Sequence, residues 1–454
     1  MFTPTITIAR NTFIEAVRQP VFLVVVLLTG ILQVLSTWGT AFSMGYTTNA
    51  EVSGDTKLLL DIGLATVFVG GTLLAAFVAT SVLSREIENR TVLTVVSKPI
   101  SRTSVILGKY LGTCVAMAIG IVIMLVFLLL AVRHGVMSTA SDSLDIPVLS
   151  LGFGSVILAV AIAGWTNYFY GWSFPQMAVL LLFPMSIAAY LVVLNFNPEF
   201  RSQPIGTDFK PEVSKAAAGI VLSMFVLTAA ATAASARLNQ VMTIVVCAGV
   251  FVLGLLSNHL FGQHIYDNTP FARVTEAQAA AFDDQDFTTA GDRYTLTLAV
   301  PPSDPIPVGT PVYYGANPSG FDLVTPVFPV LDELDEGGIP GSAIIGDAAP
   351  GRVLVRSLSD DLVSLSVVNG GGFELARPPA AGDYLFTRPT SVRAAPLAIW
   401  GAIPNLQHFW LLDAVTKNER IPMTHLGLLA GYTLVQIGAM LCIAVLLFEK
   451  RDVG

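Results

Sequence analysis

Long stretches without charge constrain this chain more than any other feature of its sequence. A helix needs about 20 apolar residues, at 1.5 Å rise each, to cross the hydrocarbon of a bilayer. Only 12% of the residues are charged and 53% are hydrophobic, whereas soluble domains carry roughly 25% charged residues. We therefore expect an α-helical polytopic membrane protein with about eight transmembrane helices. The eight nearly uncharged runs are Val21–Phe42, Leu58–Leu83, Leu111–Val132, Gly152–Trp172, Gln176–Leu194, Ala216–Ala236, Val241–Phe261 and Leu426–Phe448.

Two of these spans come from one uncharged block, residues 146–198, which is too long for a single crossing. The stretch WTNYFYGWSFP in its middle carries aromatic residues that favour the membrane interface. Pro175 follows them and suits the first turn of a new helix. Two spans fit this block best, and a re-entrant hairpin is the alternative.

The positive charges indicate how the chain is oriented. An even number of spans puts both termini on one side, and cytoplasmic segments of membrane proteins carry the excess of Lys and Arg. With both termini inside, the inner segments hold Arg10, Arg18, Arg85, Arg90, Lys98, Arg102, Lys109, Arg237, Lys450 and Arg451. The short outer loops hold Lys57, Arg133, Arg201, Lys210 and Lys215. We therefore expect a multi-pass protein of the cell (inner) membrane with both termini cytoplasmic.

The acidic residues concentrate in one late segment. Residues 267–420 contain 19 Asp and Glu but nine Lys and Arg. Short runs with a period near two, YTLTLAV, RVLVR and LVSLSVV, alternate there with turns rich in Pro and Gly. This pattern predicts an extracytoplasmic β-rich domain inserted before the last helix. An interfacial helix is expected after it over Asn405–Ala414, because Phe409 and Trp410 precede the final span.

The predicted domain order follows from these segments. Residues 1–20 form a cytoplasmic amphipathic elbow helix, with Ile6, Ala9, Phe13 and Val17 on an apolar face that lies in the headgroup plane. Residues 21–261 form spans one to seven, with a coupling loop at residues 84–110. Residues 262–420 form the β-rich domain and interfacial helix, and residues 421–454 form the last span and a cytoplasmic tail.

The loop between the second and third spans contains an unusually large share of the chain's charged residues. Its sequence is SREIENRTVLTVVSKPISRTSVILGKYLG. Pro99 stops a preceding helix, and Ser101 or Thr103 can cap the next one. The simplest explanation of such a loop is that its positive residues fix the topology.

The order of residues in this loop resembles the cytoplasmic loop of ABC-2 type ABC transporter permeases, particularly the nitrous-oxide-reductase-accessory-like group. The matching positions are Arg85, Glu86, Glu88, Thr91, Leu93, Ser97, Lys98, Pro99, Ser101, Arg102, Leu107, Gly108, Lys109 and Tyr110. The elbow, the small-residue-rich Ala231–Phe261 and the closing stretches PNLQHFW and FEKRDVG are similar to that family as well. The family core commonly has about six spans, so the two further spans and the outer domain depart from it.

The resemblance implies a channel-forming permease subunit that works as a homodimer or heterodimer. Its inner loop would dock on an ABC ATPase nucleotide-binding subunit, a separate chain that binds ATP and Mg. The residues that would form the ATPase-docking loop are Arg85, Glu86, Glu88, Arg90, Lys98, Arg102 and Lys109, with Pro99 shaping the turn. The alternative is that these are solvated charges that only set the topology.

Other chemistry has little support in the sequence. Gly108-Lys109 lacks the upstream glycine and the following hydroxyl of a Walker motif, so ATP binding by this chain is not expected. His259 and His264 are five apart, off the spacing that sets two metal ligands on one helix face. The three cysteines lie in apolar runs. We expect no catalysis, no bound cofactor or metal, and no nucleic acid partner.

Two functions of different classes fit these observations. The first is the permease subunit of an ATP-driven ABC exporter, whose cargo the sequence does not identify. The second is a membrane-anchored scaffold or receptor that presents the β domain.

Overall fold

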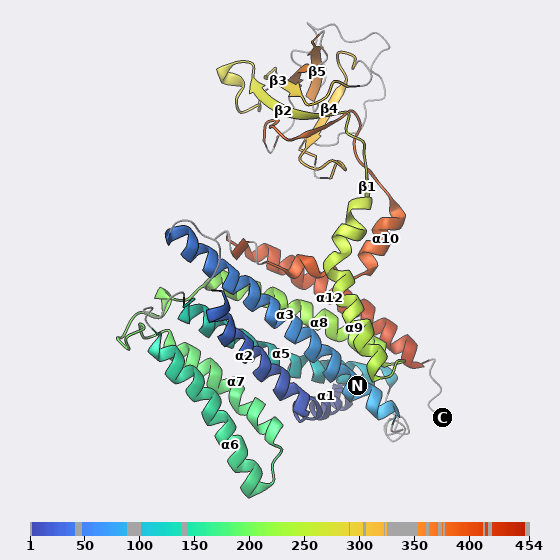
Figure 1. Ribbon diagram of the computed structural model, residues 1–454. Coiled ribbons are helices and arrows are strands. Elements are labelled where there is room, and N and C mark those ends of the chain that lie inside the picture. Colours follow the sequence, from blue (N-terminus) through green and yellow to red (C-terminus); the bar gives the residue numbers. More distant parts are fainter. Residues whose placement is uncertain are drawn as a thin grey trace. The chain divides into compact units, whose positions relative to one another are not determined.

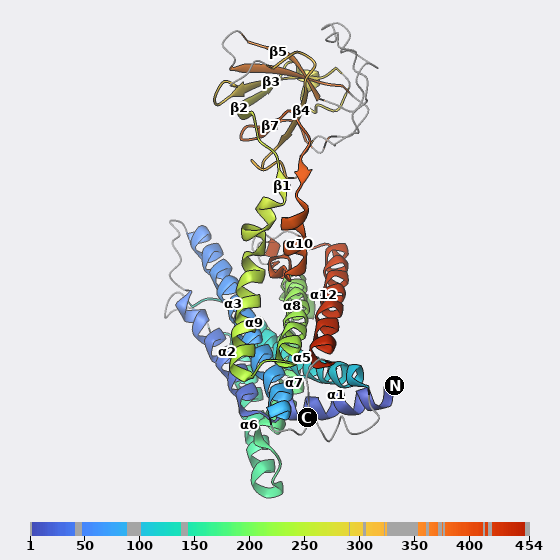
Figure 2. The same ribbon diagram turned by 90° about the vertical axis from the view of Figure 1, so that its right-hand side faces the viewer.

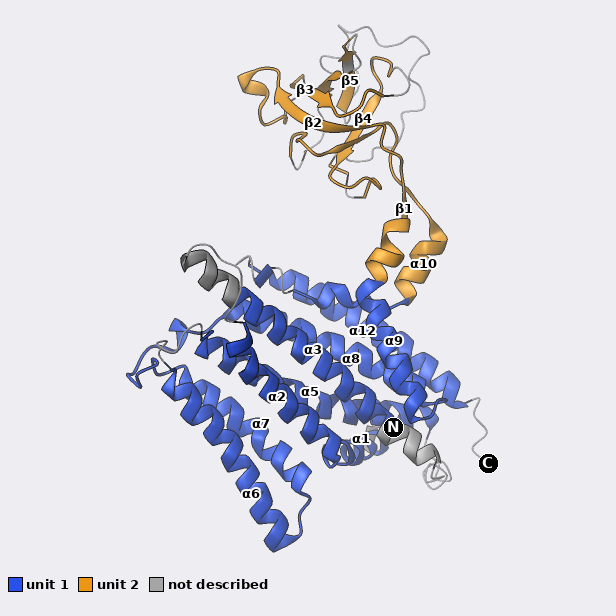
Figure 3. Cartoon of the chain, in the orientation of Figure 1, with its two compact units in different colours: residues 1–256, 403–454 blue, residues 257–402 orange. Residues whose placement is uncertain are grey.

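The computed structural model describes residues 2–449 except for 41–47, 89–100, 138–143, 290, 303–305, 322, 325–352, 360–362, 371–374, 376, 412–413 and 416–419. The chain divides into two compact units (Figure 3). Met1–Leu256 with Ile403–Gly454 form a helical unit, and Ser257–Ala402 form a unit that consists mainly of strands. Each unit is described by itself.

Long helices build the first unit (Figure 1). They are α1 (Phe2–Val17), α2 (Pro20–Gly39), α3 (Thr48–Glu88), α5 (Arg102–His134), α6 (Gly154–Tyr170), α7 (Phe174–Val193), α8 (Pro211–Ser235), α9 (Gln240–Leu260) and α12 (Met423–Glu449). The π-helical turn η1 (Val148–Phe153) leads into α6, and the short 3-10 turns η2 (Ile205–Thr207) and η5 (Leu406–Phe409) lie in connections.

Eight helices among the described residues are long and apolar enough to cross a membrane. Each overlaps one of the eight uncharged runs, so the prediction of eight spans is confirmed. Block 146–198 contains two of them, Val148–Tyr170 and Phe174–Val193. The second begins with Pro175 in its first turn, as the sequence predicted.

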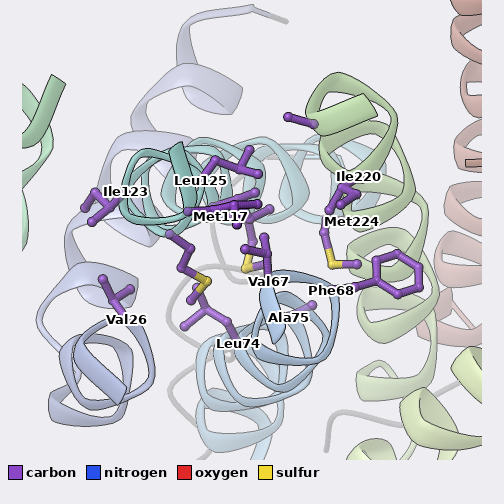
Figure 4. Packing of buried hydrophobic residues seen from close by; sticks show 14 of the residues in the cluster. Val26, Val67, Phe68, Leu74, Ala75, Met117, Ile123, Leu125, Ile220 and Met224 are labelled. Atoms are coloured by element: carbon purple, nitrogen blue, oxygen red, sulfur yellow. The ribbon is translucent and has the colours of Figure 1, made fainter. Parts of the chain in front are cut away.

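The core of the helical unit is shared by α2, α3, α5 and α8. Figure 4 shows that Val26, Leu74, Met117 and Met224 point from these four helices into one packed region. Gly71 makes room there, because a Cβ on it would lie 2.8 Å from the sulfur of Met224. Close packing of small and flexible side chains is typical of helix interfaces in membranes, where burial of apolar surface supplies little driving force.

An ion cluster around the buried Asp145 carboxylate joins two connections at the C-terminal end of α5. Arg133 Nη1 lies 2.6 Å from Asp145 Oδ2, its Nε lies 3.1 Å from Asp208 Oδ2, and its Nη2 donates to the Phe196 carbonyl. Asp145 also accepts a hydrogen bond from the Val148 N–H at the start of η1. The guanidinium thereby joins the connection before η1 to the connection between α7 and α8.

The segment before α12 enters the core of the helical unit. Leu406 and Phe409 of η5 are buried in the main hydrophobic cluster. Backbone carbonyls of this segment lie 2.6 and 2.9 Å from the positions that a Cβ would take on Gly254 and Gly219. The expected interfacial helix over Asn405–Ala414 is therefore replaced, in its described part, by a short turn seated on α8 and α9.

A backbone N–H and an aromatic ring of the same segment contact α12. The Tyr432 hydroxyl accepts a hydrogen bond from the Asn405 N–H at 2.9 Å. The Asn405 side-chain amide and His408 Nε2 are 3.1 Å apart, and the His408 ring stands edge-on to Tyr432. These bonds fix the turn against α12.

The second unit is a closed β-barrel with strand order β2-β3-β6-β5-β4-β7. Its strands are β2 (Ala272–Ala279), β3 (Arg293–Leu298), β4 (Pro311–Gly315), β5 (Val353–Leu358), β6 (Ser364–Asn369) and β7 (Tyr384–Phe386). Alternating residues such as Leu296, Val355, Leu365, Val367 and Leu385 fill the interior. This confirms the prediction of a β-rich domain before the last helix.

An ion pair stabilises the connection into β7. Arg377 forms two bonds to Asp383, at 2.6 and 2.5 Å, and Asp383 is buried. The pKa of Arg377 is raised by this carboxylate. Arg377 also lies over the Tyr314 ring, and burial raises the pKa of Tyr314 above its usual range.

A two-stranded ribbon carries the chain into and out of the barrel. β1 (Tyr266–Asp267) pairs antiparallel with β8 (Ser391–Val392), and Arg393 bonds to the Asp267 carboxylate at 2.6 and 3.0 Å. The short turn η3 (Gly262–His264) precedes β1 and contacts α10 (Ala394–Ala402), which follows β8. The chain therefore enters and leaves the barrel side by side.

Candidate coupling end of the helix bundle

Helix α3 continues beyond the part that is apolar enough to span a membrane. The uncharged run of this span ends at Leu83, and the helix ends at Glu88. The five residues after Leu83, at 1.5 Å each, extend the helix by about 7.5 Å. Arg85, Glu86 and Glu88 belong to this extension, so three of the predicted docking residues are held on a helix and not on a loose loop.

The rest of the predicted connector is only partly visible. Arg90, Lys98 and Pro99 lie outside the described residues. The connector ends at Ser101, whose side chain accepts a hydrogen bond from the Ser104 N–H at 3.2 Å. The sequence offered Ser101 or Thr103 as the cap, and this bond shows that Ser101 is the cap.

Arg102 begins α5 and reaches the C-terminal end of α12. Its Nη1 donates to the Glu449 carbonyl at 2.7 Å. Arg237, just after α8, donates from Nε to the Leu447 carbonyl at 3.2 Å. The last carbonyls of a helix have no partner within it, and cations near them also interact favourably with the helix dipole. One arginine at the start of α5 and one just after α8 thus cap α12.

A small hydrophobic cluster lies beside these caps. It consists of Ile106 from α5, Ala233 and Ala236 from the end of α8, and Ala444 and Phe448 from α12. Ile106 and Phe448 are fully buried. The ends of α5, α8 and α12 are therefore packed together where the connector joins the bundle.

The elbow helix α1 is fixed to the same helix, α5, by two glycines. A Cβ on Gly112 would lie 2.3 Å from the Ala9 carbonyl oxygen and 2.7 Å from the Thr12 Cβ. A Cβ on Gly108 would lie 2.8 Å from the Thr5 carbonyl oxygen. Figure 2 shows α1 lying crosswise to α12 at this end of the bundle. Gly108 and Gly112, the two glycines of LGKYLG (residues 107–112), therefore permit close contact between the helices. This packing role differs from the phosphate binding of a Walker motif.

The face of α1 that contacts α5 carries small residues, and Thr5 and Thr12 on it are buried. Ile6, on the apolar face that is expected to lie in the headgroup plane, is 65% exposed. Arg10, Glu15 and Arg18 are exposed as well.

Lys109 is the predicted docking residue that the structure places differently. It is 5% exposed, on the buried side of α5. Its neighbour Tyr110 donates from its hydroxyl to the Phe225 carbonyl in α8 at 3.3 Å. Because a buried side chain is not available to another protein, we leave Lys109 out of the candidate docking surface.

Two features of this end were missed from the sequence. The contact of Arg237 with α12 joins residues far apart in the chain, and no local pattern signals it. Gly108 and Gly112 do have a signal, because a Gly-x-x-x-Gly spacing permits close approach of two helices.

Metal chemistry has no support in the part of the chain that the structure describes. It contains no group of three or more His, Cys, Asp and Glu side chains that could hold a metal ion. What this end offers is mechanical: a helix extension with charges, a capped helix and a tightly packed elbow.

Comparison with known proteins places part of this architecture in a family. The model of the ABC-2 family transporter protein matches residues 6–182. This segment covers most of α1, the connector, and the spans up to the middle of α7. The barrel and the last three spans lie outside it. The curated proteins and the solved structures gave no match. The chain is thus a multi-pass membrane protein that carries an ABC-2 family transporter domain.

Proposed function

We propose that this chain is the permease subunit of an ATP-driven ABC exporter. The observation that carries the proposal is the match over residues 6–182 together with the structure at the connector. There the charged extension of α3 and the start of α5 flank one short segment. A connector attached directly to two helices can pass a rigid-body displacement to them.

Energy would come from a separate chain. An ABC ATPase that binds ATP and Mg would dock on the connector from the cytoplasm, the side on which both termini lie. Arg85, Glu86 and Glu88 form the proposed docking surface with the connector residues Arg90 and Lys98. Two permease chains, identical or different, would enclose the path of the cargo.

Arg102 takes a different role in this proposal from the one its sequence suggested. Its side chain bonds to the last carbonyl of α12. It would therefore relay movement of the connector to α12, while the residues before Pro99 contact the ATPase.

The docking surface is tested by charge reversal. The tagged chain is purified from its native membranes with Glu86→Lys and Glu88→Lys together, and the matched control reverses Glu276 and Asp283, two exposed acids of the barrel unit. Photolabelling with azido-ATP and Mg should reveal an ATP-binding subunit in wild type and control, and much less in the connector variant. Equal labelling in wild type, control and connector variant would contradict the proposed docking surface. The absence of any labelled subunit in wild type would contradict the proposal that the chain belongs to an ATP-driven exporter.

The orientation is tested separately. Lys98→Cys is made in a background without Cys114, Cys247 and Cys442, and intact cells are treated with an impermeant maleimide. Protection from outside, with labelling after permeabilisation, is expected. Labelling from outside would place the connector on the wrong side for a cytoplasmic ATPase.

A further inference from the structure

The turn between α6 and α7 is an exposed aromatic cluster. Five large rings surround it: Trp165, Tyr168, Phe169, Tyr170 and Trp172. All of them are exposed, and Tyr168 has 82% of its surface accessible. In a protein that spans a membrane, exposed aromatic rings of this kind face lipid or another protein.

The turn is held in one conformation by its own bonds. Gly171 adopts a left-handed conformation with φ +66° and ends α6, and its N–H donates to the Asn167 carbonyl. The Asn167 side chain in turn donates to the Trp172 carbonyl at 2.6 Å. Trp165 and Phe169 have ring centroids 4.3 Å apart. The rings are thus presented by a fixed turn.

Helix α6 lies at the edge of the helical unit. It packs mainly on α7 and η1. Within its span 22% of the residues are buried, against 78% for the span of α8. Most of its surface is therefore not covered by the part of the chain that the structure describes.

The chemistry of the hairpin selects lipid as that cover. Residues 146–198 contain no Asp, Glu, Lys or Arg, and a loop that extended into water would be expected to carry some. Indole N–H and phenol O–H groups on apolar rings favour the boundary between headgroups and hydrocarbon. A turn without charge but rich in Trp and Tyr fits that boundary.

The length of α6 places the turn at such a boundary. The 23 residues of Val148–Tyr170 extend about 35 Å, close to the thickness of the hydrocarbon core with its edges. The Arg133–Asp145 ion pair lies just before the first end, and the aromatic turn lies at the second. Four successive spans separate the elbow from the turn, so the turn after the fourth span is at the same end of the unit as the elbow before the first, and α7, which starts at that turn, contacts α1.

We propose that the α6–α7 turn is a lipid-binding anchor whose rings lie in the headgroup layer on the side of the coupling connector. Together with α1 it fixes the depth of the bundle at that side. This inference does not depend on transport or on an ATPase.

Tryptophan fluorescence in vesicles tests the depth of the anchor. Two variants of the full chain keep one tryptophan each, Trp165 or Trp172, with Phe at Trp38, Trp400, Trp410 and the remaining position. They are reconstituted in phosphatidylcholine brominated either near the headgroup or near the chain ends. The emission of Trp172, at the turn, should be quenched more by bromines near the headgroup. The emission of Trp165, which lies further from the turn within α6, should be quenched more by bromines near the chain ends.

The other outcomes overturn the proposal. Strong quenching by aqueous iodide without an effect of bromine would mean that the turn is in water. Protection from both would mean that protein covers it, such as a second copy of this chain. If these variants fail to fold, Tyr168→Cys with a spin label provides a second measurement, because this side chain is almost fully exposed. Its collision rate with oxygen should exceed that with a water-soluble nickel chelate.

Discussion

The contact between α1 and α5 leads to a graded prediction for three glycine substitutions. A real Cβ does not approach a heavy atom within 3.0 Å, and a Cβ on Gly112 would lie 2.3 Å from the Ala9 carbonyl oxygen. Because this oxygen belongs to the backbone, no rotamer change relieves the overlap, and α1 has to move by at least 0.7 Å. Gly108→Ala needs a smaller shift, since its Cβ would lie 2.8 Å from the Thr5 oxygen.

The magnitude follows from two opposing terms. Overpacking in a close contact costs roughly 1–3 kcal/mol, whereas Gly→Ala inside a helix gains up to about 1 kcal/mol in helix propensity. Gly249 in α9 is the matched control, because a Cβ there would meet nothing within 4 Å. Gly112→Ala should therefore be the least stable, Gly108→Ala intermediate, and Gly249→Ala equal to wild type or slightly better.

The assay is the apparent melting temperature of the purified protein in detergent, measured at one scan rate because unfolding of such proteins is often irreversible. A loss of about 2 kcal/mol corresponds to a decrease on the order of 5 °C. If Gly112→Ala has the same melting temperature as Gly249→Ala, α1 and α5 do not approach each other as the structure shows. The packing role of Gly108 and Gly112 would then be wrong.

Three further substitutions test individual polar contacts. Arg133→Gln leaves a buried carboxylate unpaired and should cost about 3–5 kcal/mol, seen as a lower melting temperature, whereas Arg201→Gln in an exposed loop should change it little. Asp383→Asn removes the charged partner of a barrel arginine and should cost about 2 kcal/mol, seen as faster hydrogen exchange of the barrel strands. Partial burial, helped by His425, lowers the pKa of His408, so its contribution is complete above the unfolded value of about 6.5 and is lost as the pH falls below it. On acidification, the melting temperature of His408→Gln should therefore decrease less than that of wild type. Equal decreases would exclude His408 as the cause of the loss of stability at low pH.

The spans were the most predictable part of the structure. Hydropathy over about 20 residues is a local property, and a bilayer leaves few alternatives for the backbone of such a segment. The break at Trp165–Trp172 and the cap at Ser101 were also readable, because interfacial aromatics and helix caps act within a few residues. Each of these signals needs no knowledge of which helices are neighbours.

The contacts between distant segments could not be predicted in this way. YTLTLAV and LVSLSVV indicated strands, and they correspond to β3 (Arg293–Leu298) and β6 (Ser364–Asn369). Closure of the barrel, however, depends on the pairing of β7 with both β2 and β4. The alternation of apolar and polar residues within one strand does not reveal which other strands it pairs with. The Arg102 cap on Glu449 is a similar case, because 347 residues separate the two.

The position of the barrel in the chain has a simple physical basis. Asp267 and Ser391 are register partners in the β1–β8 ribbon, so the two ends of the inserted segment are already adjacent. Insertions are tolerated where the ends of the inserted domain lie close together. The Asp267–Arg393 bond fixes this junction, so the helical unit need not change to accommodate the barrel.

This junction predicts that the barrel can be removed cleanly. Deleting residues 268–390 and joining Asp267 to Ser391 through Asn-Gly gives a two-residue loop of the type that closes antiparallel hairpins. We expect the shortened chain to elute as a single species in detergent, with hydrogen exchange in α2 and α8 unchanged. The azido-ATP experiment on this variant then separates the two functions, because a permease core should keep its ATP-binding subunit, whereas a scaffold organised around the barrel has no such subunit to keep. Aggregation of the shortened chain would show instead that the helices depend on the barrel for their fold.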